Sequence, residues 1–237
     1  MRFLLSTVLL TLSLLACDAA TVGVRLPQGG PDAVQPDELH RLLWTLTDPR
    51  LGGRVPGSSG ASRVAAEVAK RFQKLHLEPA FGESFRHDLG PARGELVCGI
   101  RPGGGQGAVT VAALDPGIGI LSAVPIAGLI GLVKAFDGPE ERDRAYAFCL
   151  LPEAGGLEGY LTWPPTPVDQ TARFYILGSL TGPELQASPG PDLAGIHTKI
   201  LHTGPLASSM GDDMGKVDFE ALAVQVKTAY STVSEGR

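Results

Sequence analysis

The sequence predicts a three-layer α/β/α sandwich built on a mostly parallel mixed sheet. Short apolar segments bounded by glycine and proline alternate with longer segments whose apolar residues recur at helical spacing, and this alternation is typical of α/β domains. Some short segments, such as 146–151, are apolar at nearly every position, as expected for strands covered on both faces. With 43% hydrophobic and 19% charged residues, the chain has enough apolar material for one large core and is not disordered.

Charge and cysteine content exclude other classes of protein. The net charge is −5, so no excess of basic residues indicates a nucleic-acid partner, and we predict none. The three cysteines are too few for a scaffold built from disulfides.

The N-terminal residues predict export and lipidation. A positive charge at Arg2 and an apolar run to Ala16 indicate a signal peptide over residues 1–16. Residues 14–17 resemble a bacterial lipobox, which implies that Cys17 carries a lipid; the alternative is an ordinary signal cleaved at Ala19 or Ala20. We therefore expect a lipid-anchored protein of the bacterial cell envelope that faces the periplasm or the cell exterior.

Domain boundaries follow from composition. Residues 17–35 are rich in small and polar residues and predict a flexible tether. Residues 36–237 are then expected to form a single domain.

Two helices are expected at the start of this domain. Residues 36–47 carry leucines at helical spacing. Residues 58–77 show a continuous apolar face, and Ser58 or Ser59 can cap the N-terminus of that helix.

The remaining elements are predicted from the length of each apolar run. The expected strands are 95–100, 108–114, 145–151, 173–177 and 199–202. The expected later helices are 123–136 and 219–233. The segment Gly103–Gly107 lacks the ending of a phosphate-binding loop and is interpreted as a flexible hairpin between strands.

Ligand sites in open α/β sheets lie beyond the carboxyl ends of the strands. That rule selects four loops for closer attention: 114–117, 152–156, 177–179 and 206–216.

Several motifs at and around these loops resemble one family. They are the glycine-rich signature 48–58, the segment 97–103, the helix opening 122–125, the strand and turn 148–160, and the C-terminal segments 195–204 and 212–219. Together they resemble metallopeptidase family 28, the zinc aminopeptidases, and especially its glutaminyl cyclase branch. The resemblance spans roughly residues 37–235 and implies a zinc exopeptidase-like fold.

The metal ligands that this resemblance implies are missing. The five family ligand positions fall on residues that cannot hold zinc in the family's way: Ala113, Leu121, Ala154, Ser179 and Ser208. A catalytic zinc needs three protein ligands among His, Asp, Glu and Cys. We therefore predict no cofactor, with zinc at a relocated site as the alternative.

Two partner positions of the family remain as vestiges. Asp115 falls on the aspartate that orients a metal-binding histidine, and Glu153 falls on the general base. Without a metal there is no activated water for Glu153 to deprotonate, so we expect a solvated loop charge there. Asp115 is expected to cap the turn at Pro116–Gly117.

Other chemistry-bearing residues receive structural interpretations. The five histidines show no metal-binding spacing, and Asp212 and Asp213 are expected to cap a helix or face water. Cys98 and Cys149 are expected to be buried free thiols, with a disulfide as the alternative if their strands are neighbours. Trp163 is expected to pack over the sheet; the alternative is an exposed patch of Tyr160, Leu161, Trp163, Pro164 and Pro165.

These observations predict a membrane-anchored, catalytically inactive homologue of zinc aminopeptidases and glutaminyl cyclases that acts in binding or scaffolding. Its partner would be a peptide or a protein in the former active-site cleft, besides the membrane itself. Two alternatives stay open: an active zinc-dependent aminopeptidase or glutaminyl-peptide cyclotransferase with a relocated site, and a structural lipoprotein.

Overall fold

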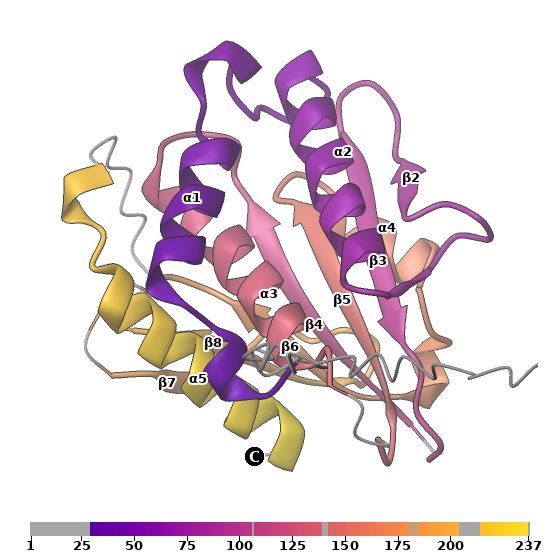
Figure 1. The fold of residues 1–237 in the computed structure, drawn as a ribbon. Coiled ribbons are helices and arrows are strands. Elements are labelled where there is room, and N and C mark those ends of the chain that lie inside the picture. Colours follow the sequence, from indigo (N-terminus) through magenta and orange to yellow (C-terminus); the bar gives the residue numbers. More distant parts are fainter. Residues whose placement is uncertain are drawn as a thin grey trace, which may run out of the picture.

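The structure, a computed structural model, describes residues 29–105, 107–138, 142–180, 182, 184–203 and 214–236. The signal segment, Cys17, Ser208, Asp212 and Asp213 lie outside the described residues. The predicted fold class is confirmed: a central mixed sheet is flanked by helices on both faces (Figure 1).

The sheet has a parallel centre and antiparallel edges. Its strand order is β1-β3-β5-β4-β6-β8-β7, with β2 paired to β3. Strands β4, β5, β6 and β8 pair in parallel, whereas β3 and β7 pair antiparallel to their inner neighbours. The bounds are β1 Glu78–Pro79, β2 Arg86–Asp88, β3 Glu95–Arg101, β4 Ala108–Asp115, β5 Ala145–Pro152, β6 Thr171–Leu177, β7 Gln186–Pro189 and β8 His197–His202.

All five predicted strands are present, and three short ones were not predicted. Strands β1, β2 and β7 have two to four residues each and lack the apolar run by which the others were found. They lie toward the edges of the sheet, where polar side chains reach solvent.

The helices are distributed unequally over the two faces. Helices α1 (Pro36–Leu46), α2 (Ser59–Lys74), α3 (Val124–Ala135) and α5 (Phe219–Glu235) cover one face, and the short α4 (Gly156–Thr162) lies on the other (Figure 1). Helix α3 is buried on almost every side, because it lies between the sheet and its neighbouring helices. Among the described residues, no helix has the length and apolar character needed to cross a membrane.

Each face of the sheet has its own apolar cluster. The larger one joins the four helices to side chains such as Val111 and Phe148. The smaller one lies under α4, where the Tyr160 hydroxyl shares a hydrogen bond of 2.8 Å with Thr110 Oγ1. The site described below lies at the carboxyl end of the parallel strands, between these two clusters.

The glycine-rich segment after β3 is not a hairpin, contrary to the prediction. Strands β3 and β4 lie on opposite sides of β5, so the segment crosses the start of β5. A Cβ atom at Gly103 would lie 2.0 Å from the carbonyl oxygen of Arg144, and one at Gly105 would lie 1.6 Å from that of Asp143. The glycines thus allow close backbone packing, which the sequence alone does not reveal.

The two core cysteines form a disulfide, so the expectation of free thiols is wrong. Strands β3 and β5 are antiparallel neighbours whose register places Cys98 directly opposite Cys149. Their Cα atoms are 4.3 Å apart and their sulfur atoms are bonded. Both residues are fully buried in the smaller cluster.

Trp163 also departs from its expected position. It is 52% exposed, and its ring lies against His87 with centroids 4.5 Å apart. Tyr160, by contrast, is fully buried, so an exposed patch that includes Tyr160 does not form either.

Candidate functional site

The tips of β4 and β5 lie together at the carboxyl edge of the sheet. Asp115 ends β4 and pairs in register with Pro152 at the end of β5. The backbone N–H of Glu153 donates to the carbonyl oxygen of Asp115 at 3.0 Å. The structure therefore brings Asp115 and Glu153 to adjacent strand ends, as expected for two neighbouring parallel strands.

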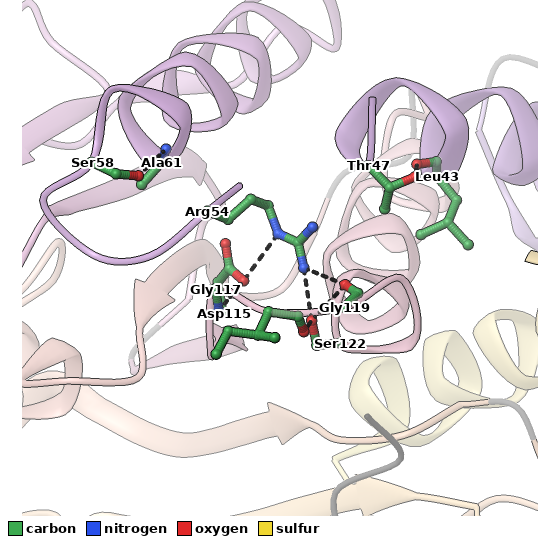
Figure 2. Close-up of polar contacts among 10 residues, drawn as sticks. Leu43, Thr47, Arg54, Ser58, Ala61, Asp115, Gly117, Gly119 and Ser122 are labelled. Carbon is green, nitrogen blue, oxygen red and sulfur yellow. Dashed lines mark hydrogen bonds and ion pairs between the residues drawn. The ribbon is translucent and has the colours of Figure 1, made fainter. Parts of the chain in front are cut away.

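An arginine that sequence reasoning missed holds the tip of β4. Arg54 Nε donates to Asp115 Oδ1 at 3.2 Å, and Arg54 Nη2 donates to the Gly119 carbonyl at 2.8 Å and to Ser122 Oγ at 2.7 Å (Figure 2). The side chains of Arg54 and Asp115 are only 5% and 9% exposed. We call Arg54, Asp115, Gly117, Gly119 and Ser122 the Arg54 clasp.

Glycines in the signature loop make the Arg54 clasp possible. A Cβ atom at Gly117, where φ is +82°, would lie 2.8 Å from the carbonyl oxygen of Arg54. At Gly60 it would lie 1.8 Å from that of Gly53. The backbone N–H of Arg54 also donates to the Gly117 carbonyl at 3.2 Å. The glycines around Arg54 thus let the loop before α2 lie directly on the turn after β4.

Asp115 caps that turn, as predicted. Its Oδ1 accepts from the backbone N–H of Gly117 at 2.9 Å as well as from Arg54. Burial raises the pKa of Asp115, and the Arg54 charge and the Gly117 hydrogen bond offset only part of that rise. The contacts within the fold therefore offset only part of the desolvation cost of the charged Asp115 carboxylate.

Glu153 has a different environment. It is exposed at the rim, and no described residue donates a hydrogen bond to its side chain. The following Ala154 is exposed too, and α4 begins at Gly156. Glu153 thus lies beside the Arg54 clasp without taking part in it.

The other positions implied by the family resemblance lie in varied surroundings. Ala113 is fully buried in the larger cluster, and Leu121 is partly buried against it in the 3-10 turn Leu121–Ala123. Ser179 accepts a backbone hydrogen bond from Thr203 at 2.8 Å.

The residues that the structure describes do not fit a zinc ion at this edge. In that part of the chain, no three His, Cys, Asp or Glu side chains are grouped so as to hold a metal. Asp115, the acid nearest to such a site, uses Oδ1 for Arg54 and Gly117, and its Oδ2 alone is one ligand where a catalytic zinc needs three. The methyl group of Ala113 offers no lone pair.

The histidines are dispersed rather than clustered. His202 is buried, and its Nε2 lies 2.7 Å from Ser188 Oγ, whereas His197 on the same strand is exposed. His40 contacts the Phe219 ring. His76 lies near Asp137, and His87 lies between the rings of Phe81 and Trp163.

A hollow of about 470 Å³ adjoins the Arg54 clasp. Its walls are the first turns of α2, the hairpin of β2 and β3, and the tips of β4 and β5. Charged and hydroxyl side chains line it, among them Arg54, Ser58, Ser62, Arg86, Glu95 and Asp115. We call this space the polar hollow. In the sequence, the feature that could have indicated this hollow is Arg54, a charged residue within the glycine-rich signature 48–58.

No family model matches the chain, and no curated protein is significantly similar to it. Solved structures do match. A leucine aminopeptidase precursor from Bacteroides thetaiotaomicron has a TM-score of 0.66 at 11% identity, over 90% of this chain and 99% of that one. A glutaminyl cyclase from Porphyromonas gingivalis has a TM-score of 0.68 at 9% identity, over 86% and 99% of the two chains.

The LapA aminopeptidase of Legionella pneumophila matches with a TM-score of 0.64 at 11% identity, over 86% of this chain and 73% of that one. The fold is that of zinc-dependent exopeptidases and glutaminyl cyclases. At these identities the likeness concerns the fold alone.

Proposed function

We propose that this chain is a non-catalytic relative of the zinc aminopeptidases and glutaminyl cyclases, and that it acts by binding at the bacterial cell envelope. The observation that carries the proposal is the state of the β4 tip. Asp115, the acid that the resemblance places beside a metal ligand, forms a buried ion pair with Arg54 instead.

The neighbouring residues support the same conclusion. The position two residues before Asp115 is the buried Ala113, which cannot coordinate a cation. Glu153 is exposed and lacks a described hydrogen-bond donor to its side chain. A general base needs a substrate or a water held in a fixed place, and the described residues around Glu153 supply no such position.

Attachment to the membrane is the second part of the proposal. A lipid on Cys17 would anchor the domain through the residues that follow it, since each buried methylene contributes about 0.8 kcal/mol. The predicted tether boundary at residue 35 is too late, because Ala33 and Val34 are already buried and Val34 belongs to the larger cluster. The Cys98–Cys149 disulfide supports an exported protein, because disulfides persist in oxidising compartments. The variant Cys17→Ser is expected to release the protein from the membrane fraction and to abolish incorporation of labelled fatty acid; an unchanged membrane fraction would contradict the anchor.

Zinc content and turnover test the catalytic part. Purified protein is incubated with zinc, dialysed, and measured by metal mass spectrometry, then assayed with a glutaminyl peptide and an aminoacyl reporter. We expect zinc well below one ion per chain and no turnover. One bound zinc per chain, with turnover that Glu153→Gln abolishes and the control Glu158→Gln on α4 preserves, would overturn the proposal.

A further inference from the structure

We propose that the polar hollow binds a hydroxylated primary amine, such as an amino sugar or an amino alcohol, with Asp115 as the counter-ion of its ammonium group. This inference deepens the proposed binding function and rests on it. The hollow lies between α2 and the hairpin of β2 and β3.

The hollow has the size of a small-molecule site. Its volume of about 470 Å³ lies within the range of about 300–1,000 Å³ usual for ligand pockets. Small residues in its wall, including Gly57, Ala61 and Gly94, leave the space open. A single sugar ring can enter such a hollow, whereas a folded partner domain cannot.

Asp115 presents an unused acceptor to this space. Its side chain is nine-tenths buried, and Oδ1 takes both of its hydrogen bonds, from Arg54 and Gly117. No described residue donates to Oδ2, and in Figure 2 the oxygen without a dashed line lies on the side of the loop that carries Ser58. A carboxylate can accept about four hydrogen bonds, so Oδ2 is free to bind a donor from a ligand.

The two arginines of the hollow are directed at protein acceptors. Arg86 donates from Nε and Nη2 to both oxygens of Glu95, at 2.6 and 2.7 Å, and from Nη2 to Ser62 Oγ at 2.9 Å. Arg54 is directed at Asp115, Gly119 and Ser122. Nη1 of each arginine has no acceptor among the described residues, but a bidentate fork also needs Nε or Nη2, and these are already used; this disfavours bidentate binding of a carboxylate or phosphate.

The charge of the wall favours a cation. Three acidic residues, Asp88, Glu95 and Asp115, line the hollow together with two arginines and no lysine. The N-terminus of α2 adds about half a positive charge, but Ser58 Oγ already accepts from the N–H of Ala61 in its first turn, at 3.1 Å. Because burial raises the pKa of Asp115 despite Arg54, a further positive group would stabilise the charged carboxylate.

Serine hydroxyls indicate what else the ligand carries. Ser58 and Ser62 each accept a hydrogen bond through Oγ, from Ala61 N–H and from Arg86 respectively. Each therefore keeps its own O–H to donate. Hydroxyl oxygens next to the ammonium group would accept these bonds, so a hydroxylated amine fits better than a purely alkyl amine.

Calorimetric titration with matched probes tests the inference. Glucosamine carries the ammonium and the hydroxyls, ethanolamine is the acyclic amine, and N-acetylglucosamine and glucose lack the ammonium. We expect glucosamine or ethanolamine to bind at least tenfold more tightly than N-acetylglucosamine and glucose. Comparison of the affinities of glucosamine and ethanolamine then shows whether the hollow prefers a ring or an open chain. Equal binding of glucosamine and N-acetylglucosamine, or no binding of either amine, would overturn the inference.

Two substitutions on α2 locate the binding. Ala61→Leu fills the hollow with a good helix former and should abolish the binding of the amine, whereas Ala66→Leu on the exposed side of α2 should leave it unchanged. Binding that survives Ala61→Leu in a variant with native circular dichroism would place the ligand elsewhere and refute this site. Should the bound amine be chemically converted, the non-catalytic function fails instead, so the two failures are distinguishable.

Discussion

The tips of β4 and β5 are neighbours in one parallel pair, yet their carboxylates differ in every physical respect. Asp115 at the β4 tip is buried, ion-paired and hydrogen-bonded. Glu153 at the β5 tip is exposed, and only its backbone takes part in the structure. In the resemblance to the zinc enzymes, both residues fall on functional positions of the family. In this structure, however, only the side chain of Asp115 has described hydrogen-bond partners.

The loop that reaches each tip makes the difference. The glycine-rich loop before α2 packs against the β4 tip, where Arg54 bonds to Asp115 through its side chain and to Gly117 through its backbone. The β5 tip passes through Gly155 directly into α4, and Arg93, whose side chain lies against Gly155, donates to Glu158 rather than to Glu153. A carboxylate at a strand end thus becomes a buried, paired group or a surface charge, according to which distant segment lies beside it.

The largest expected effect comes from opening the Arg54 clasp. Arg54→Met leaves Asp115 as an unpaired buried charge, and such changes cost about 3–5 kcal/mol in free energy of unfolding. Arg50→Met is the matched control, because the Arg50–Asp48 pair is at the surface and surface pairs contribute at most about 1 kcal/mol. Urea unfolding followed by circular dichroism measures the free energy of unfolding of both variants. Equal losses would show that the buried Arg54–Asp115 pair contributes no more to stability than the surface pair.

Removing both charges of the clasp should restore part of that loss. In Arg54→Met with Asp115→Asn, no buried charge remains, and the amide oxygen can still accept from Gly117. A double-mutant cycle should give a coupling energy of about 1–3 kcal/mol between the two positions. Additive losses in the cycle would contradict direct coupling.

The next effect is a pH dependence of the free energy of unfolding that arises from Asp115 at the β4 tip. Because the pKa of Asp115 is raised above its ordinary value of 3.8, the folded state holds this proton more tightly than the unfolded state does. Its contribution to stability therefore falls as pH rises from about 4 through the raised pKa, by about 1.4 kcal/mol per unit of rise. The stability of the wild type minus that of Asp115→Asn, measured by urea unfolding across pH, should decline in this window; a difference that grows with pH would be the wrong sign.

The smallest effect is expected at the β5 tip. Glu153→Gln removes an exposed charge without a described side-chain partner, so the free energy of unfolding should change by no more than about 0.5 kcal/mol. Thermal and urea unfolding check this. A loss comparable to that of Asp115→Asn would erase the contrast between the two tips.

The elements that were predicted correctly are those whose signal is local. Apolar runs identified β3, β4, β5, β6, β8 and the helices α3 and α5, and helical periodicity identified α1 and α2. The short strands and α4 lack such signals. The segment Gly103–Gly107 was misread because strand order is non-local: nothing in its sequence shows that β5 lies between β3 and β4.

The candidate site was less predictable for the same reason. Asp115 could be recognised as a turn cap from the proline and glycine that follow it. Its partner Arg54 lies 61 residues away, and only the fold brings the two together. The register that places Cys98 opposite Cys149 is likewise absent from the spacing of the cysteines.

The bond between Cys98 and Cys149 has a consequence for how the protein is made. It closes a covalent ring over a separation of 51 residues, and this ring contains β4, α3 and the residue that Arg54 grips. Closing a ring of that size lowers the entropy of the unfolded chain by the equivalent of about 4 kcal/mol. Protein produced in a reducing cytoplasm would lack this constraint, so the history of the preparation becomes a variable in every stability measurement.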